Sequence, residues 1–174
     1  MPFIVEIKAR CDDQERIRRL LQGREARFIG EDHQIDTYFR VPHGRLKLRE
    51  GTIEHHLIHY HRPDQHGPKG SDVLLYKPRP DAGLKALLTR ALGVLVVVDK
   101  RREIYFIDNI KFHIDRVEGV GTFVEIEAID EEGRIGTEPL HDQCQHYLDL
   151  FDLPPASLVA GSYSDLLLEK SEGQ

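Results

Sequence analysis

The 174-residue sequence contains no tryptophan, one methionine and two cysteines, Cys11 and Cys144. Neither cysteine has a partner at the spacing of a zinc site, so we expect reduced thiols in a cytoplasmic protein. Long hydrophobic runs are also missing: Leu92–Val98 is the longest, contains a glycine, and is too short to span a bilayer. The first residues do not combine a charged region with an apolar stretch, so no secretory signal is expected.

An excess of positive charge is missing as well, because 30 acidic residues outweigh 24 Lys and Arg residues and give a formal net charge of −6. This balance argues against a general nucleic-acid-binding protein. With 40% hydrophobic residues, the composition is that of a soluble globular protein, and the length predicts one domain. We expect this domain to cover residues 1–168, followed by a frayed polar tail at residues 169–174.

Three segments have the spacing of apolar residues that is typical of helices. The first is capped by Asp12 or Asp13 and continues to about Leu21; the second lies between Asp81 and Gly93, and the third follows Thr137. Most of the remaining sequence is typical of strands separated by short turns. The expected strands are residues 3–10, 34–40, 45–50, 53–62, 72–78, 94–107, 110–117 and 121–129. They predict an α+β fold in which an eight-stranded antiparallel β-barrel closes on itself, with the helices packed on its outside.

Ionisable residues recur at every second position of several expected strands. Because residues i, i+2 and i+4 of a strand share one face, these groups point the same way, and apolar residues point the other way. The groups are Glu6, Lys8 and Arg10; Arg45, Lys47 and Arg49; Lys111, His113 and Asp115; and Glu125 with Glu127. Cations concentrate on some strands and carboxylates on others.

Two interpretations fit this alternation. Each charged face can be a solvated surface, as in many half-exposed strands. Alternatively, the apolar faces pack outward under the helices and the ionic faces line the barrel interior, where buried charges need partners or ligands. Such an interior suits a triphosphate with Mg²⁺ or Mn²⁺, because Lys and Arg hold phosphate oxygens and carboxylates hold a hard cation.

An ordered set of motifs resembles the CYTH family of triphosphate tunnel metalloenzymes, and within it the branch labelled class IV adenylyl cyclase-like. The family opens with a Glu-x-Glu-x-Lys strand. Here Glu6 and Lys8 match its second Glu and its Lys, and Ile4 replaces its first Glu. The resemblance spans about Val5 to Leu167. Further matching segments are residues 36–39, 45–49, 60–63, 100–103, 113–119, 123–127 and 163–167.

The resemblance implies roles for individual residues. Catalysis is expected to depend on Glu6, Glu125 and Glu127, and the metal ligands, for Mg²⁺ or Mn²⁺, are expected to be these three residues with Asp115. The residues expected to bind the triphosphate are Lys8, Lys47, Arg49, Arg62, Lys100 and Arg102, with Arg10, Arg45, Lys77 and Lys111 as weaker candidates. The resemblance also offers a homodimer as one form of assembly, and it involves neither nucleic acid nor a membrane.

Three functions stay open at this point. The first is hydrolysis of ATP, thiamine triphosphate or tripolyphosphate. The second is an adenylyl cyclase that converts ATP to cyclic AMP and pyrophosphate; it must also seat adenine, and the sequence identifies no adenine pocket. The third is a polyphosphate- or nucleotide-binding module without turnover, which the missing carboxylate at Ile4 favours and the retained Glu6, Glu125 and Glu127 oppose.

Several other features are expected to be structural. His55, His59 and His61 share the parity of an outer face, whereas His113 is expected beside Asp115 on the inner face. The segment 67–70 lacks the Walker pattern and is expected to be a turn. The remaining pair, Tyr163 and Asp165, is expected to pack over one mouth of the tunnel.

Overall fold

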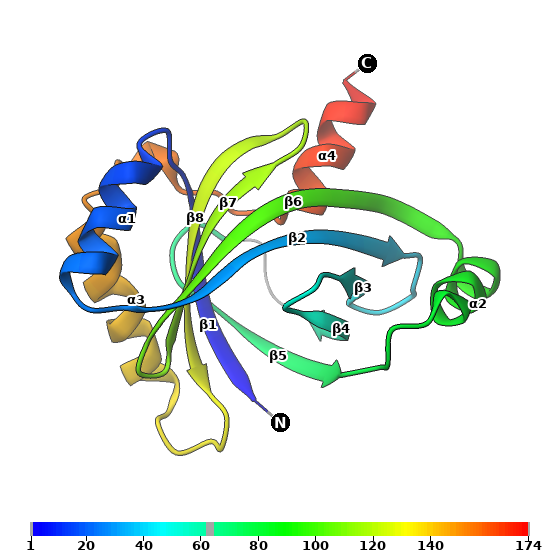
Figure 1. The fold of residues 1–174 in the computed structure, drawn as a ribbon, viewed down its shortest axis with the longest axis horizontal. Helices are drawn as coiled ribbons and strands as arrows, with labels where there is room; N and C mark the ends of the chain where they lie inside the picture. The colour runs from blue at the N-terminus through cyan, green and yellow to red at the C-terminus, as the bar shows by residue number, and fades with distance from the viewer. Residues whose placement is uncertain (1, 62–64, 174) are drawn as a thin grey trace.

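The computed structural model describes residues 2–61 and 65–173. The expected phosphate ligand Arg62 lies outside these residues. Within them the chain forms eight strands, shown in Figure 1. The strands are β1 (Phe3–Arg10), β2 (Arg27–Phe39), β3 (Arg45–Glu50), β4 (His55–His61), β5 (Lys69–Tyr76), β6 (Val94–Ile107), β7 (Ile110–Val117) and β8 (Gly121–Asp130).

The eight described strands close into a barrel in the order β1-β5-β4-β3-β2-β6-β7-β8, and every neighbouring pair is antiparallel. The expected eight-stranded antiparallel barrel is therefore confirmed. It is not one simple meander. β1 lies between β5 and β8, and the long strands β2 and β6 join the β2–β5 meander to the β6–β8 meander. Closure gives each strand an inner and an outer face.

The main apolar core lies outside the barrel wall, between β1, β7 and β8 and the helices α1 (Gln14–Gly23) and α3 (Thr137–Phe151). Asp13 caps α1 by accepting a hydrogen bond from the Arg16 amide. The outward-facing residues of the three strands pack against the helices. These buried residues include Val5, Ile7, Ala9, Ile110, Phe112, Ile114, Val124 and Ile126 from the strands, and Ile17, Leu21, Leu140, Cys144 and Phe151 from the helices.

The sequence predicts the other two helices unequally. The expected helix between Asp81 and Gly93 is confirmed as α2 (Ala82–Leu92), but it was expected to cover an apolar face and buries none of its residues completely; Leu87 is 63% exposed. Helix α4 (Tyr163–Glu172) was not expected and occupies most of the segment interpreted as a frayed tail. Its start has a sequence signature, a capping box between Ser162 and Asp165. A 3₁₀ turn, η1 (Pro155–Ser157), precedes it.

Helix α4 brings Tyr163 into a second apolar cluster. The cluster also holds Tyr38, Ile58, Tyr60, Val98, Val117 and Phe123, and α4 adds Leu166 and Leu167. The inner face of β6 (Val94–Ile107) therefore has two parts. Val98 belongs to the apolar cluster, whereas Lys100 and Arg102 further along the same face line a charged cavity.

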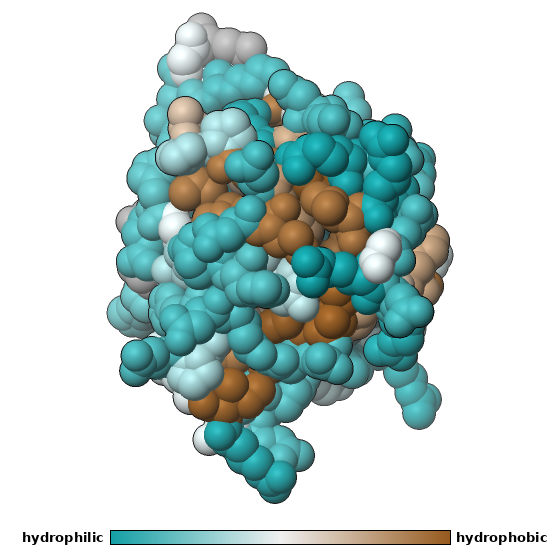
Figure 2. Space-filling view, turned by 90° about the vertical axis from the view of Figure 1, so that its left-hand side faces the viewer, coloured by the Kyte–Doolittle hydropathy of each residue, from teal (hydrophilic) through white to brown (hydrophobic). Residues whose placement is uncertain are grey.

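The face that carries α1 and α3 is mostly hydrophilic, with hydrophobic residues visible between the polar ones (Figure 2). Among the described helices, none is both long and apolar enough to cross a membrane.

We expect Phe112→Ala to lower the free energy of unfolding by about 3–5 kcal/mol, because it opens a cavity in the outer core. Phe112 is fully buried, and its ring contacts those of Tyr147 and Phe151. Urea denaturation measures the loss. Leu87→Ala, on the exposed side of α2, is the matched control and is expected to change stability by less than about 0.5 kcal/mol. Equal losses in the two variants would contradict this assignment of the core.

Candidate functional site

A cavity of about 640 Å³ occupies the barrel interior. Lys8 and Lys100 on its wall are only 4% and 2% exposed, so their strand faces are not solvated surfaces. The interpretation of the ionic faces as a barrel interior is correct. Of the expected site residues, the cavity is lined by Glu6, Lys8, Lys47, Arg49, Lys100, Arg102, Glu125 and Glu127.

The cationic side of the cavity is built around Asp36 on β2. Arg49 donates to its two oxygens over 2.9 and 2.8 Å, Lys100 Nζ lies 2.6 Å from Oδ2, and Lys47 Nζ lies 3.6 Å away. Burial raises the pKa of Asp36, but the charges of Arg49, Lys100 and Lys47 outweigh it and hold the pKa well below its usual value. One carboxylate thus faces three cations, so this side carries excess positive charge.

The excess of positive charge affects the pKa of Lys100. Its burial, together with the nearby guanidinium of Arg49, lowers the pKa of Lys100 well below its usual value despite the contact with Asp36. A bound anion would relieve this repulsion, because it would supply the missing negative charge. The sequence motif contained Asp36, but nothing in the sequence showed that cations from β3 and β6 would meet there.

The carboxylate side lies where β1 pairs with β8. The register places Glu6 directly opposite Glu127, and Lys8 directly opposite Glu125. Arg102 Nη2 donates to Glu125 over 3.2 Å. Burial raises the pKa of Glu125, but Lys8 and Arg102 hold it well below its usual value. Two carboxylates opposite each other across antiparallel strands repel, so a cation between Glu6 and Glu127 would stabilise them.

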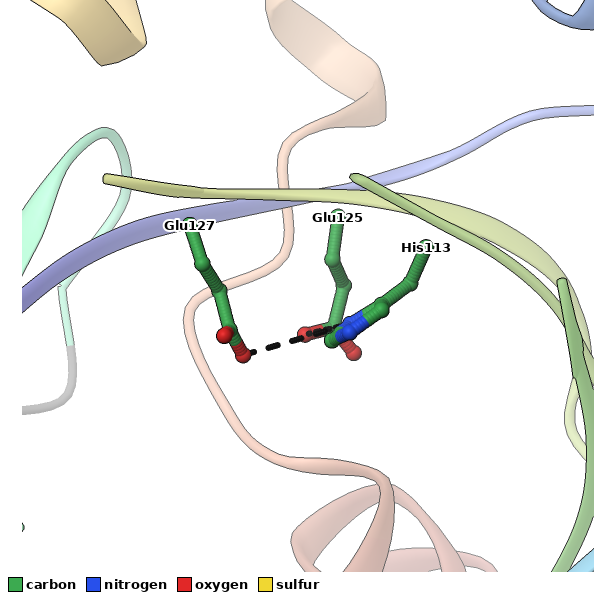
Figure 3. A group of neighbouring side chains, drawn as sticks. All are labelled: His113, Glu125 and Glu127. Atoms are coloured by element: carbon green, nitrogen blue, oxygen red, sulfur yellow. Dashed lines mark ion pairs between the residues drawn. The ribbon is translucent and has the colours of Figure 1, made fainter. Parts of the chain in front are cut away.

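His113 on β7 joins these carboxylates (Figure 3). Its Nδ1 lies 3.6 Å from Glu125 Oε2 and 3.9 Å from Glu127 Oε1. One ligand atom from each of the three residues lies within 4.8 Å of the others. His113 is 1% exposed, and within the described part of the chain neither ring nitrogen has a hydrogen-bond partner. A buried imidazole that makes no hydrogen bond to the described residues and lies beside two carboxylates fits a divalent cation.

Asp115, one of the expected metal ligands, is held by Arg102 and Tyr163 in the structure. Arg102 donates to its two oxygens over 2.8 and 2.7 Å, and the Tyr163 hydroxyl donates to Oδ2 over 2.6 Å. Asp115 is fully buried and is not in the group of His113, Glu125 and Glu127. Its carboxylate therefore holds the Arg102 guanidinium in place. Tyr163 does more than pack over a mouth, since it links α4 to this ion pair.

Glu54 is a cavity residue that the sequence did not reveal. Its carboxylate accepts from Gln34 over 2.9 Å, and it forms ion pairs with Arg49 and Lys111. Buried Asp32 fixes the turn before Glu54 by accepting from the amides of residues 52, 53 and 54. Gly51 is required there, because a Cβ would lie 2.5 Å from Asp32. Residue 54 was expected inside the strand 53–62, on the face opposite His55, but it was not singled out; β4 begins one residue later, at His55.

The weaker candidates separate into two pairs. Lys77 and Lys111 line the cavity. Arg10 instead donates to the Val120 carbonyl, and Arg45 pairs with Asp165 at the start of α4.

The parity of β4 is as expected, because the cavity-lining residues of this strand are His56, Ile58 and Tyr60, and the residues between them face outward. His56 therefore reaches the cavity, whereas His55, His59 and His61 do not line it. Burial lowers the pKa of His56, which favours its neutral form. The segment 67–70 was expected to be a turn, but its second half, from Lys69, is the start of strand β5.

We expect Asp36→Asn to lower the free energy of unfolding by about 3–5 kcal/mol, because it leaves buried Arg49 and Lys100 without their carboxylate. Chemical denaturation at neutral pH measures this change. Glu132→Gln is the control, since it breaks an exposed pair with Arg134 and is expected to cost less than about 1 kcal/mol. An Asp36→Asn protein as stable as the control variant would show that the cation cluster does not depend on Asp36.

The chain was compared with known proteins and protein families. No curated protein gave a significant match. Among solved structures, the PH1012 protein from Pyrococcus horikoshii OT3 is similar, with 27% identity, a TM-score of 0.82, and coverage of 94% of this chain and 98% of that one.

Two more distant structures show the same fold. A candidate adenylate cyclase from Vibrio parahaemolyticus is 18% identical, with a TM-score of 0.73 over 95% of this chain and 98% of its own. HpAC1 from Hippeastrum, a candidate adenylyl cyclase with a dominant triphosphatase activity, is 13% identical, with a TM-score of 0.64 over 99% and 96%. The CYTH domain model matches residues 4–145. With that match and a closed barrel that has a charged interior, the chain belongs to the CYTH domain family.

Proposed function

We propose that this protein is a metal-dependent phosphohydrolase that cleaves a triphosphate inside its barrel. The observation that carries the proposal is the pairing of two opposite environments in one cavity. Three cations, Lys47, Arg49 and Lys100, share the carboxylate of Asp36, and a carboxylate pair with His113 lies across the barrel. A polyanion bridged by a divalent cation complements both environments at once.

The cationic residues bind and orient the phosphates. Lys47, Arg49 and Lys100 offer donors to phosphate oxygens once an anion shares them with Asp36. Arg102 is positioned by Asp115 and faces Glu125, so it lies between the two sides of the cavity. Fixed donors of this kind stabilise charge on the phosphate oxygens in the transition state without reorganising.

The carboxylate side would hold the cation, with Glu6, Glu125, Glu127 and His113 as the residues in reach. When bound, Mg²⁺ or Mn²⁺ supplies Lewis-acid polarisation of the phosphate oxygens. Ile4 contributes no carboxylate, so the ligand set here depends on residues deeper in the barrel. The imidazole of His113 and the carboxylate of Glu125 occupy that depth, directly opposite each other in the β7–β8 register.

Cyclisation of ATP is the second candidate function. It would use the same electrostatics, with the ribose 3′-hydroxyl in place of water as the nucleophile. The fold does not separate the two, since the similar Hippeastrum protein carries both a cyclase designation and a triphosphatase activity. The deciding experiment incubates the protein with Mg²⁺ or Mn²⁺ and, separately, tripolyphosphate, thiamine triphosphate and ATP. Orthophosphate release supports hydrolysis, cyclic AMP with pyrophosphate supports cyclisation, and binding without product indicates a binding module.

We expect Glu125→Gln and Glu127→Gln to reduce metal-dependent turnover by at least about 100-fold, because each removes a negative ligand group. Initial rates at saturating Mn²⁺ measure the loss, and circular dichroism checks the fold. Glu118→Gln is the matched control, since Glu118 is exposed and does not line the cavity. Unchanged turnover in both Glu125→Gln and Glu127→Gln would contradict the assignment of these residues as metal ligands.

Asp115→Asn separates a positioning role from a metal-ligand role. We expect it to weaken tripolyphosphate binding about 10-fold or more in the presence of EDTA, because Arg102 loses the carboxylate that accepts two of its hydrogen bonds and keeps only its contact with Glu125. Mn²⁺ binding without phosphate is expected to change less than twofold. Calorimetric titrations measure both affinities, with Asp99→Asn at an exposed pair as control. The reverse pattern, weakened Mn²⁺ and unchanged tripolyphosphate binding, would restore Asp115 as a ligand.

A further inference from the structure

The donor atoms on the carboxylate side differ from those that the family resemblance implies. That resemblance implies a ligand set made only of carboxylates: Glu6, Asp115, Glu125 and Glu127. In the structure, Asp115 instead accepts hydrogen bonds from Arg102 and Tyr163. The third residue that lies with Glu125 and Glu127 is His113. The donor set in the structure therefore contains a nitrogen as well as oxygens.

Strand β7 holds the side chain of His113 in the barrel interior. Its neighbours Phe112 and Ile114 are both buried in the outer core, so alternation directs residue 113 inward. In the β7–β8 register His113 lies directly opposite Glu125. Figure 3 shows His113, Glu125 and Glu127 extending to the same side of the strands, with their ends converging. The packed strand, rather than a loop, thus sets the position of the imidazole.

The distances suit a shared ion better than a direct hydrogen bond. Nδ1 of His113 lies 3.6 Å from Glu125 Oε2 and 3.9 Å from Glu127 Oε1, beyond the usual N–H···O range of about 2.7–3.2 Å. Ligand atoms lie about 2.0–2.2 Å from a small divalent cation, so two ligands of one ion can be up to about 4.4 Å apart. Both separations fall within that reach.

The two oxygens of Glu125 have different surroundings. Oε1 accepts a hydrogen bond from Arg102 Nη2 over 3.2 Å and lies 3.9 Å from Lys8 Nζ. The contact with His113 is made by the other oxygen, Oε2. Oε2 is thereby the oxygen of Glu125 that is placed to ligate an ion together with the imidazole.

A nitrogen ligand changes which cation a site prefers. Carboxylate oxygens suit Mg²⁺, Ca²⁺ and Mn²⁺, whereas imidazole suits transition-metal ions such as Fe²⁺, Ni²⁺ and Zn²⁺. Mg²⁺ takes oxygen ligands and dehydrates reluctantly, so it gains little from an imidazole. Within the transition-metal series, affinity for a given site rises from Mn²⁺ through Co²⁺ to Ni²⁺. A site with His113 in place of Asp115 therefore favours transition-metal ions over Mg²⁺.

We infer that the imidazole of His113 is a metal ligand that makes this site select a transition-metal ion, such as Mn²⁺ or Co²⁺, over Mg²⁺. The inference rests on the proposed metal-dependent function and adds the class of ion to it. Ile4 offers no carboxylate where the family motif has a Glu, so one oxygen ligand fewer competes with the imidazole.

The test measures the affinity of the protein for Mn²⁺, Co²⁺ and Mg²⁺, each without a phosphate compound, by calorimetric titration. The wild-type protein is expected to bind Mn²⁺ and Co²⁺ at least about 10-fold more tightly than Mg²⁺. His113→Gln is expected to weaken Co²⁺ binding about 10-fold or more and Mg²⁺ binding less than about threefold, because it removes the nitrogen and keeps the carboxylates. His33→Gln is the matched control, since His33 lies at the surface beside one carboxylate, Asp99, and is expected to leave all three affinities unchanged.

A spectroscopic measurement detects the nitrogen ligand without depending on the folding of a variant. Electron spin echo envelope modulation of the wild-type protein with substoichiometric Mn²⁺ is expected to show a directly bound imidazole nitrogen. His113→Gln is expected to lose this signal and His33→Gln to keep it. Circular dichroism checks that both variants are folded.

The outcomes separate the inference from the function on which it rests. The inference is overturned if Mn²⁺ binds without a nitrogen signal, if Mg²⁺ binds as tightly as Mn²⁺ and Co²⁺, or if none of the three ions binds. His113 would then be only an ion-pair partner of the two carboxylates. Hydrolysis of a triphosphate with Mg²⁺ would still support the proposed function in that case. Conversely, a nitrogen signal and a transition-metal preference without hydrolysis of any triphosphate would overturn the proposed function and support the metal site.

Discussion

Lys47, Arg49 and Lys100 converge on the carboxylate of Asp36 inside the barrel, and much of the rest of the structure serves this buried cluster. Cations removed from water are costly unless they are paired. The larger apolar core therefore lies on the outside, where the apolar faces of β1, β7 and β8 pack under α1 and α3, and only the smaller cluster around Tyr163 borders the cavity. The same cluster has more cations than carboxylates, since Asp36 is shared by three of them and Glu54 is shared by Arg49 and Lys111, and this excess is the basis for the proposed anion binding.

A second buried network ties the C-terminal helix to the cavity. Tyr163 at the start of α4 donates to Asp115, which in turn holds Arg102. The Lys8 ammonium lies 4.1 Å from the centre of the Tyr163 ring. Because the capping box of Ser162 and Asp165 fixes the first turn of α4, the position of Tyr163 is set by local structure as well as by packing. Helix α4 is thereby part of the site.

The type of side chain that lines the cavity changes along the barrel. Cations around Asp36 are followed by the carboxylates of Glu6 and Glu127, and then by the apolar pair of Ile4 and Ile129. Each step follows from strand alternation, since only every second residue reaches the cavity. Glu131 also lines the cavity, two residues beyond Ile129, so the apolar pair lies between charged residues.

Strand periodicity alone placed Lys47 and Arg49 on one face, and Glu125 and Glu127 on another, and the structure confirms both groupings. It also predicted seven of the eight described strands to within about three residues at each end; β2 begins seven residues earlier than expected, at Arg27. The alternation of polar and apolar residues depends only on residues close together in the chain, so it can be recognised from the sequence. The same locality explains why α1 and α3 were predicted from their caps and apolar spacing.

What the sequence did not determine is which face of each strand is inside, because alternation is symmetric until the sheet closes. Closure decided that the ionic faces meet, and the register then chose the partners. In the closed barrel, Asp36 on β2 contacts cations from β3 and β6. Asp115 on β7 accepts hydrogen bonds from Arg102 on β6, and His113 on β7 lies beside Glu125 on β8. These contacts join residues from different strands or from far along the chain, so no local pattern encodes them. Only the tertiary structure set a buried charge beside its partner, and that placement determines what the cavity can bind.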